Sequence, residues 1–427
     1  MMFYKEINFK ETPIGEIPKN WEAVKLEDVI LEIADGGTPS TKFKEYFNGD
    51  LPWVNIRDIT KDIYDTERHL SQYGLKNSSA KLWNEGTVIF SFGASIGEVG
   101  IARRKLCTKQ GIAGIVPDLN RIQSEFLYYV LLRASPLIKE IGKGMGSTIN
   151  EVRPPKLRKL IVFSCPPVSE QQRIVEVLST VDDTIREADE VIAKTERLKK
   201  GLMQHLLIKG IGHKEFKDTE IGTIPKEWKI VQLQDLISDI KNGFASGKRD
   251  KQGIVQIRMN NLTTDGRLLL ETYLKVPLPE NVNIWLLKPN DFLFNNTNSI
   301  DLVGKSAIFK GAPFPCTFSN HFTRLRFKED YVLPEWILYH FIIHWEEGYF
   351  KSVAIRHVGQ AAVHSEYLLK LRVPLPPLTE QHKIIEILSD ANRKLELERN
   401  GKVKMEKIKQ GLMDLLLTGK VRIKVGE

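Results

Sequence analysis

The stretch "PPVSEQQRIVEVLS", residues 166–179, occurs a second time as "PPLTEQHKIIEILS" at residues 376–389. Two more stretches are repeated: "KKGLMQHLL" at 199–207 returns as "KQGLMDLLL" at 409–417, and "TPIGEIPKNW" at 12–21 returns as "TEIGTIPKEW" at 219–228. The first two pairs lie 210 residues apart and the third 207. Matched ends around long, less similar middles indicate that a whole unit has been duplicated.

A long helix is predicted after each Pro-Pro. No proline occurs from Ser169 to Lys209, and apolar residues recur there at alternating steps of three and four, which indicates a seam of period near 3.5. Ser169 and Gln172 fit a capping box, whereas Thr379 keeps only the cap. Each helix should run about 40 residues, or ~60 Å.

Such a helix, with one apolar stripe, is not stable alone. We expect the two to pair, and to pair antiparallel if a two-fold axis relates the repeats; two unrelated surface helices are the alternative. The expected interface residues are Ile174, Leu178, Val181, Ile185, Ile192 and Leu202 in the first helix, and Ile384, Leu388, Leu395, Met405, Leu412 and Leu416 in the second. Glu398 and Lys402 interrupt the second seam.

The regions between the helices predict a domain of class α+β in each half. Short β-like runs such as "LPWVNI", "TVIF" and "IAGIV" precede a predicted helix at "SEFLYYVLL", and "IVQIRM", "DFLFNN", "TRLRF" and "PEWILYHFI" repeat that order. We expect two tandem, pseudo-two-fold-related domains at 1–165 and 213–375, separated by a long antiparallel two-helix coiled coil made of 166–212 and 376–427. We match Phe90 with Phe294, Ile56-Arg57 with Ile257-Arg258, and Val99-Gly100 with Val303-Gly304.

Composition is that of a globular protein with two domains. The chain has 427 residues, a net charge of +8 and a pI of about 9.1, a modest excess that permits a polyanionic partner without requiring one. No run of about 18 apolar residues occurs and the first residues lack the apolar core of a signal peptide, so we expect no membrane span and a cytoplasmic protein. Cys107, Cys165 and Cys316 are too dispersed for a zinc knuckle and too few for a disulfide framework.

Polar loops recur at matched places in both domains, with different side chains. Each loop residue alone is explained as a turn former, but the recurrence favours binding of base edges and phosphates. The DNA-binding candidates are Thr38, Ser40, Lys42, Arg57, Ser95, Gln110 and Ser147 in the first half, and Lys248, Arg258, Asn260, Asn296, Asn298, Asn320, Arg356 and Gln360 in the second.

No catalytic constellation or metal site is predicted. "GKS" at 304–306 lacks the first glycine of a phosphate-binding loop, which would fall at Ser299. His340 and His344 share a helix face without a third ligand, so we expect them to be helix surface or core residues. The Pro-Pro motifs lack the preceding Asn or Asp and the following aromatic residue of an amino-methyltransferase.

Taken together, the doubled "PPVSEQQRIVEVL…GLMQHLL" and "PPLTEQHKIIEIL…GLMDLLL", with "IGEIPKNW", "GGTPSTKFKEYFNGDLPWVNIRDI" and "GASIGEVGI", resemble the specificity subunit of type I restriction-modification enzymes. The resemblance covers essentially the whole chain. The second half departs from the pattern, since it has "FNNTNSIDLVGKS" and no "GGTPSTK" segment.

The resemblance implies that each domain reads one half of a bipartite double-stranded DNA target and that the helices set the spacing. It also implies two methyltransferase subunits that use S-adenosylmethionine, restriction subunits that use ATP and Mg²⁺, and neither catalysis nor a cofactor in this chain. The alternatives are a stand-alone nuclease or methyltransferase, and a module that binds RNA or protein. Because the first helix has the more regular seam, we also expect residues 1–212 alone to form an antiparallel homodimer.

Overall fold

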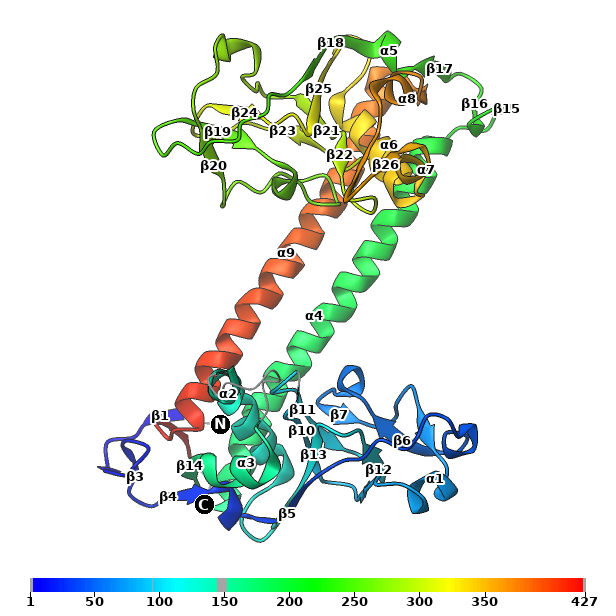
Figure 1. Ribbon diagram of the computed structural model, residues 1–427. Helices are drawn as coiled ribbons and strands as arrows, with labels where there is room; N and C mark the ends of the chain where they lie inside the picture. Colours follow the sequence, from blue (N-terminus) through cyan, green and yellow to red (C-terminus); the bar gives the residue numbers. More distant parts are fainter. Residues whose placement is uncertain (1–2, 94, 144–151, 425–427) are drawn as a thin grey trace. The chain divides into compact units, whose positions relative to one another are not determined.

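The computed structural model describes residues 3–93, 95–143 and 152–424. The chain folds into two compact units: unit 1 comprises Met1–Asp189 and Asn400–Glu427, and unit 2 comprises Glu190–Arg399 (Figure 1). Each unit contains one α+β domain and half of each long helix, so unit 1 is built from two distant parts of the sequence.

Unit 1 contains two main sheets. The first has the order β5-β13-β10-β11-β7 and the second β8-β6-β12-β9. Their strands are β5 (Ile30–Asp35), β6 (Leu51–Val54), β7 (Asp62–Ile63), β8 (His69–Leu70), β9 (Leu82–Trp83), β10 (Val88–Ser91), β11 (Val99–Ala102), β12 (Leu106–Thr108) and β13 (Ile112–Pro117). Three strand pairs complete the unit: β1 (Phe3–Lys5) with β29 (Val421–Ile423), β2 (Phe9–Lys10) with β3 (Ile17–Pro18), and β4 (Glu22–Lys25) with β14 (Val162–Cys165). The helices of the domain are α1 (Gln72–Lys76), α2 (Ser124–Lys143) and α3 (Pro154–Leu160).

Unit 2 repeats this plan with different lengths. Its main sheets have the orders β18-β25-β21-β23 and β20-β19-β24. Their strands are β18 (Ile237–Asn242), β19 (Ile254–Ile257), β20 (Leu274–Val276), β21 (Asp291–Asn295), β23 (Ser306–Phe309), β24 (Cys316–Phe318) and β25 (Phe322–Phe327). The remaining strands are β15 (Phe216–Thr219) with β16 (Gly222–Pro225), β17 (Lys229–Gln232) with β28 (Arg372–Leu375), and a small sheet of β22 (Thr297–Asn298), β27 (Gln360–Ala362) and β26 (Ile355–His357). The helices are α5 (Leu233–Leu236), α6 (Pro334–Glu346), α7 (Tyr349–Val353) and α8 (Ser365–Leu369).

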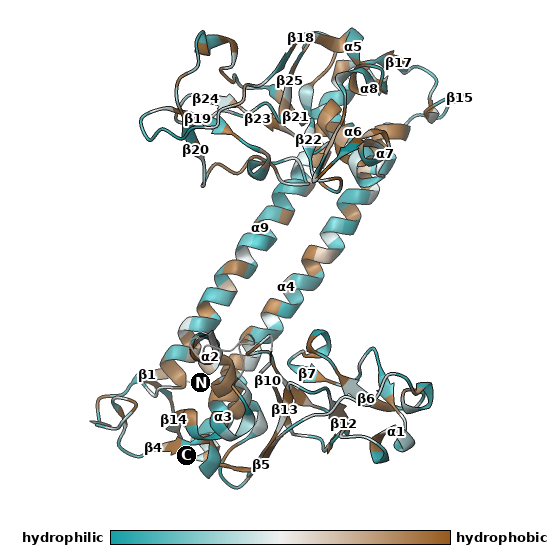
Figure 2. Ribbon diagram, viewed as in Figure 1, coloured by the Kyte–Doolittle hydropathy of each residue, from teal (hydrophilic) through white to brown (hydrophobic). Residues whose placement is uncertain are grey.

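The two long helices are α4 (Val168–Lys209) and α9 (Leu378–Leu416), close to the predicted lengths. Both are largely hydrophilic along their length, whereas the central strands of each domain are hydrophobic (Figure 2). Ion pairs join the helices at about 2.6–2.7 Å: Asp182 with Lys409 and Asp189 with Lys402 in unit 1, and Glu196 with Arg399 in unit 2. Residue numbers rise along α4 as they fall along α9, so the pairing is antiparallel, as predicted.

The predicted interface residues are all buried or half-buried, but some belong to the domain cores and others to the contact between the two helices. Ile174, Leu178 and Leu416 belong to the hydrophobic core of unit 1, and Ile384 and Leu388 to that of unit 2. Leu395 is buried, whereas Val181, Ile185, Ile192, Leu202, Met405 and Leu412 are half-buried. The helix ends are therefore fastened into the domains, and the middle of the pair relies on a narrow seam with ion pairs beside it. Lys402 interrupts the apolar pattern because it pairs with Asp189.

The repeated sequence stretches are the places where the domain joins its helix. Trp21 Nε1 donates to Glu170 Oε2 at 3.0 Å, and Trp228 Nε1 donates to Glu380 Oε2 at 2.9 Å. Both tryptophans are fully buried. Within each half of the chain, the tryptophan that ends the "IPKNW" or "IPKEW" stretch thus contacts the glutamate that follows Pro-Pro. This contact explains why both stretches are kept in both halves.

The glutamine that follows each glutamate makes a second matched contact. Gln171 Nε2 donates to Arg121 O at 2.8 Å, and Gln381 Nε2 donates to Tyr331 O at 3.0 Å. Both glutamines are fully buried in the first turn of their long helix, and the acceptors lie just before α2 and α6. The expected capping role of Ser169 is corrected, because α4 begins at Val168 and Ser169 lies within its first turn.

Strand register corrects two of the three matches made within the domains. Phe90 pairs with Val99, and Phe294 pairs with Ser306, so Phe90 matches Phe294 as predicted but Val99 matches Ser306. Gly97 N donates to Ser91 O and Gly304 N to Asn295 O, each at 2.9 Å, which makes Gly97 the counterpart of Gly304.

The match of Ile56-Arg57 with Ile257-Arg258 is also wrong. Lys109 N donates to Val54 O, and Ser319 N donates to Ile257 O, each at 3.0 Å. Val54 is thus the counterpart of Ile257, and Arg258 is the counterpart of Asn55. The error arose because both halves contain the letters "IR", but in the first half they lie two residues further beyond the strand than in the second.

Candidate nucleic-acid interface

A polar recess lies in unit 1 where two neighbouring strands end. Strands β6 and β12 are parallel, so the residues that follow them, Asn55 and Lys109, emerge at the same edge of the sheet. Asn55 N donates to Asp58 Oδ2 at 2.8 Å, which fixes a short 3-10 turn, η3 (Ile56–Asp58), beyond the strand. This turn places Arg57 at the rim of the recess.

The recess is a cavity of about 490 Å³ whose lining comes from three separate segments. Its lining residues are Asn55, Ile56, Arg57, Gly93, Ser95, Lys109, Gln110, Gly111 and Ile112. Gly111 closes the back of the recess with a φ of +89°, a left-handed conformation that favours glycine, and its N–H donates to Asp35 Oδ1 at 2.8 Å. Three of the sequence candidates, Arg57, Ser95 and Gln110, converge here.

Unit 2 places different side chains at the corresponding positions. Strands β19 and β24 are parallel, and Arg258 and Ser319 follow them where unit 1 has Asn55 and Lys109. A 3-10 turn, η4 (Met259–Asn261), again follows and carries the exposed Asn260. Asn320 is exposed beside Ser319. The same backbone frame therefore presents an Arg, a Ser and two Asn side chains in place of an Asn, a Lys, an Arg and a Gln.

His321 and Lys305 add polar groups to the unit 2 site. Burial and the charge of Arg258 lower the pKa of His321, so its imidazole is neutral at neutral pH. Lys305 is buried, and burial lowers its pKa. Its Nζ donates to Leu262 O at 2.7 Å and to Met259 O at 3.3 Å, so it supports the turn η4 from behind.

The other candidates of the first half lie outside the recess. Thr38, Ser40 and Lys42 are exposed on the loop after β5, and this loop is held by a bond of 3.0 Å from Trp53 Nε1 to Gly37 O. Ser147 lies outside the described residues. Their role as DNA contacts stays a prediction.

In the second half, Lys248 is exposed on the loop after β18, and Arg356 and Gln360 are exposed on the hairpin of β26 and β27. Asn296 is half-buried, and its Nδ2 donates to Thr323 Oγ1 at 3.0 Å. Asn298 is buried, its Nδ2 donates to Asn295 Oδ1 at 2.6 Å, and its Oδ1 accepts from Ser299 N. These bonds tie the Asn298 side chain to its own loop, and its role as a base contact stays a prediction.

Sequence reasoning missed Asn55, Lys109, Ser319 and His321. The signal that could have found Asn55 and Lys109 is that each follows directly after a short apolar run, "LPWV" and "LCT". Without strand pairing, however, nothing in the sequence says that these two runs lie side by side.

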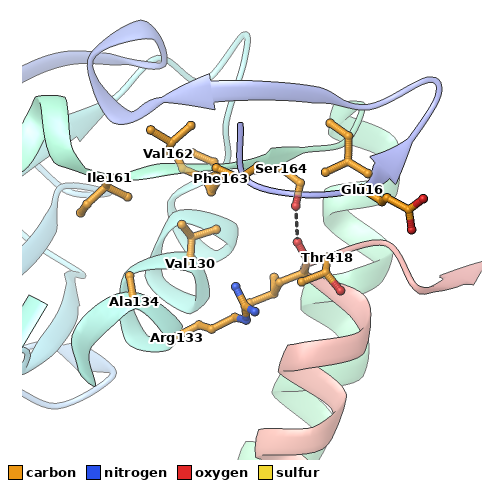
Figure 3. A pocket seen from close by; sticks show the side chains of 12 residues that line it. Glu16, Val130, Arg133, Ala134, Ile161, Val162, Phe163, Ser164 and Thr418 are labelled. Atoms are coloured by element: carbon orange, nitrogen blue, oxygen red, sulfur yellow. Dashed lines mark hydrogen bonds between the residues drawn. The ribbon is translucent and has the colours of Figure 1, made fainter. Parts of the chain in front are cut away.

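A smaller pocket in unit 1 has a different character. It measures about 140 Å³ and lies where α2, β14 and the end of α9 meet (Figure 3). Two of its polar side chains are already paired: Ser164 Oγ donates to Leu417 O at 2.5 Å, and Arg133 pairs with Asp414 at 2.9 Å. The pocket is a packing gap beside the helix joint, with few groups left to orient a ligand.

The sites rejected on sequence are packed into the structure. His340 is buried, which lowers its pKa to about 3, and its ring lies edge-to-face with that of Trp336, with ring centroids 4.9 Å apart. Burial raises the pKa of all three cysteine thiols. In residues 3–93, 95–143 and 152–424, no group of His, Cys, Asp or Glu side chains is arranged to hold a metal ion, and no helix is long and apolar enough to cross a membrane.

Comparison with known proteins places both units in one family. The model of the type I restriction modification DNA specificity domain matches residues 18–196 and again 225–407. The MjaVIII specificity subunit of Methanocaldococcus jannaschii is 28% identical over 99% of this chain and 98% of its own length. The putative MjaX specificity subunit of the same organism is 29% identical over 99% of both chains.

Solved structures show the same fold. The S subunit of a type I restriction-modification system from M. genitalium covers 96% of this chain and 99% of its own, with a TM-score of 0.55 at 14% identity. A chain from a type I R-M system, solved to explain complex assembly and conformational transition, covers 95% of this chain and 99% of its own, with a TM-score of 0.58 at 19% identity.

Proposed function

The chain belongs to the family of type I restriction-modification specificity subunits, and we propose that it selects a bipartite DNA target, with each unit reading one half. The observation that carries this proposal is the pair of matched sites at the strand ends. The backbone frame is the same in both, whereas the side chains at four corresponding positions differ. Asn, Gln and Arg side chains suit base edges, and Lys and Arg suit phosphates.

In this proposal α4 and α9 set the distance between the half-sites. Contacts that fasten each domain to the helices, from Trp21 to Glu170 and from Trp228 to Glu380, support such a role, because a spacer transmits a distance only when its ends are fixed. The antiparallel pairing lets the two domains address opposite strands of the duplex.

Catalysis in this proposal belongs to partner subunits. Two methyltransferase subunits dock on this chain and use S-adenosylmethionine, and restriction subunits use ATP and Mg²⁺. Incubation of the purified chain with labelled S-adenosylmethionine and DNA should give no methyl transfer until a methyltransferase subunit is added. Transfer by the chain alone would favour a stand-alone enzyme.

The spacer role is tested by lengthening both helices at the boundary of the two units. We place one heptad after Asp189 and another after Arg399, because the ion pairs Asp189–Lys402 and Glu196–Arg399 are then kept within their own units. Seven residues add ~10 Å, about three base pairs of B-DNA at ~3.4 Å each. Methylation mapping with the methyltransferase subunit should show a gap wider by about three base pairs between unchanged half-sites.

A heptad in α4 alone is the matched control, since it separates the ion-paired residues of the two helices and should abolish a defined gap. If the doubly lengthened chain methylates the original target, the helices do not set the spacing.

A further inference from the structure

Arg258 differs from the neighbouring arginines of unit 2 in lacking an acidic partner. Arg324 pairs with Asp239, and Arg326 pairs with Asp291 at 2.5 Å. Among the described residues, by contrast, no carboxylate pairs with Arg258, although its side chain is half-buried. A half-buried guanidinium without an anion is costly to keep, so its position calls for a role beyond folding.

Most of the hydrogen-bonding capacity of Arg258 is unused. A guanidinium has five N–H donors, and the described residues supply one acceptor, Ser246 O, at 3.3 Å from Nη2. The buried Nε has no partner. Two other buried polar atoms nearby also lack one: Oε1 of Gln256, two residues earlier on the same strand face, and Oγ of Ser319 at the end of the paired strand.

The backbone around Arg258 fixes where the side chain starts. Arg258 N donates to Asn261 Oδ1 at 2.9 Å, and Gln256 Nε2 donates to Phe244 O at 3.0 Å, which ties the loop after β18 to the strand. The bond from Nη2 to Ser246 O then orients the guanidinium under the same loop. A charged group held in this way suits a ligand of fixed geometry, whereas the exposed Lys248 on the loop suits a phosphate.

We propose that Arg258 reads a guanine in the half-site bound by unit 2, an inference that rests on the proposed function. Guanine presents two acceptors, O6 and N7, at the major-groove edge, and paired N–H donors of one arginine match them. Asn260, on the turn that follows Arg258, and Asn320, just after the paired strand, are exposed and uncharged, and they suit neighbouring base edges. Unit 1 has Asn55 at the corresponding position, so the same base is not expected there.

The test is selection from a randomised duplex library by the full chain together with its methyltransferase subunit. The Arg258→Lys variant keeps the charge but loses the fork, so discrimination at one guanine of one half-site should fall about 10- to 100-fold, with every other position unchanged. Arg258→Ala should relax the same position. Asn55→Ala is the matched control and should alter the other half-site alone.

Three results would overturn the inference: equal weakening on all sequences with a smaller salt slope, which marks a phosphate contact; relaxation at a position other than guanine; and an unchanged target for Arg258→Lys. Thermal unfolding of each variant ensures that a folding defect is not mistaken for any of these. If the wild-type chain selects no bipartite sequence at all, the proposed function fails rather than the assignment of Arg258.

Discussion

Glu170 in unit 1 and Glu380 in unit 2 occupy the same place at the start of a long helix, yet they meet different partners. Glu170 accepts from Trp21 and from two nitrogens of Arg422, at 2.8 and 2.7 Å. Glu380 accepts from Trp228 and lies 2.8 Å from His213 Nε2. Arg422 also bonds to Glu6 at 2.7 Å, so one arginine joins two carboxylates in unit 1, whereas among the described residues the one side-chain base paired with Glu380 is His213.

A second pair of matched positions shows the same contrast. Asp182 of α4 accepts from Lys61 at 2.8 Å, from Tyr129 at 2.6 Å and from Lys409 at 2.6 Å. Its counterpart 210 residues later, Asn392, makes a neutral bond of 3.2 Å to Tyr339. Duplication has thus kept the geometry of the joints, while unit 1 uses Arg and Lys partners where unit 2 uses His213 and Asn392.

The largest expected effect comes from removing the two glutamates. Glu170→Ala leaves Arg422 buried with one remaining carboxylate, so the free energy of opening unit 1 should fall by ~3–5 kcal/mol. Glu380→Ala removes hydrogen bonds without leaving a fixed charge, so unit 2 should lose ~1–3 kcal/mol. Native-state hydrogen exchange, followed separately in each unit, measures both. Equal losses would show that the charge of Arg422 does not distinguish the joints.

Acid should weaken unit 1 before unit 2. Burial acts to raise the pKa of Asp182, but hydrogen bonds from Lys409, Lys61 and Tyr129 outweigh it and lower the pKa below its ordinary value of 3.8. A carboxyl group with a lowered folded-state pKa stabilises the fold above its unfolded pKa, and this contribution is lost as the pH falls through the folded value. The free energy of opening unit 1, obtained from exchange rates after correction for the pH dependence of intrinsic exchange, should therefore fall below about pH 4.

Asp182→Asn, which copies unit 2, is the matched variant for this pH dependence. It should cost ~2 kcal/mol at neutral pH, because Lys61 and Lys409 lose their shared anion, and it should flatten the acid dependence of unit 1. An unchanged acid profile in the variant would assign the loss to other carboxylates, such as Glu6, whose pKa the hydrogen bond from Arg422 lowers.

A smaller effect is expected from the charges in the middle of the long helices. They also bear on the homodimer expected for residues 1–212. In the same register, the repeat offset of 210 places Lys199, Ile192 and Asp189 of a second copy where Lys409, Lys402 and Arg399 lie. Asp182 would keep a lysine, but Asp189 would face an isoleucine and Glu196 an aspartate. The first helix is thus matched in charge to the second rather than to itself.

We therefore expect residues 1–212 to homodimerise weakly. Asp189→Lys should tighten that dimer roughly tenfold, since it converts two like-charge contacts into ion pairs. Sedimentation of the wild-type and variant half-chains measures this. A wild-type half-chain that dimerises as tightly as Asp189→Lys would show that the central charges do not choose the partner.

The smallest effect is expected at Lys109, which lines the recess of unit 1, and at the corresponding Ser319 of unit 2. Lys109→Ala should reduce the salt slope of DNA binding by about one, because a phosphate contact is lost, and should weaken all sequences alike. Its counterpart in unit 2 carries no charge, so Ser319→Ala should leave the slope unchanged. Titration of binding at several salt concentrations distinguishes them, and a change of target sequence in Lys109→Ala would move this residue to the base contacts.

The fold was easiest to predict from the sequence where the repeated residues make buried contacts. Trp21, Glu170 and Gln171 are repeated because each makes a buried contact, and from them came the domain order and the antiparallel helix pair. Matching within the domains failed at Val99 because loops of different length precede it. A valine followed by a glycine then occurs by chance in both halves, and only the strand pairing shows which residues of the two domains correspond.

The site was predicted in part for a related reason. Arg57, Ser95 and Gln110 could be named because polar loop residues are rarely needed for packing, and the structure brings these three to one recess. Asn298 looks the same in the sequence, yet its side chain is bonded within its own loop. Asn55 and Lys109 converge only because β6 and β12 run parallel, and that pairing joins segments more than 50 residues apart. Arg258 could be named as a candidate from its loop, but only the structure shows that no carboxylate among the described residues pairs with it.

The pairing of β1 with β29 has a consequence for synthesis on the ribosome. Residues 3–5 of unit 1 find their strand partner only when residues 421–423 have been made, and Glu170 waits for Arg422, 252 residues later. At 5–20 residues per second, the 252 residues from Glu170 to Arg422 take about 13–50 s to synthesise. Unit 2 is continuous from Glu190 to Arg399, so it can close first although its sequence comes second. The domain that begins the chain is thus the last to be completed, and a nascent chain halted before residue 421 leaves unit 1, not unit 2, exposed to chaperones and proteases.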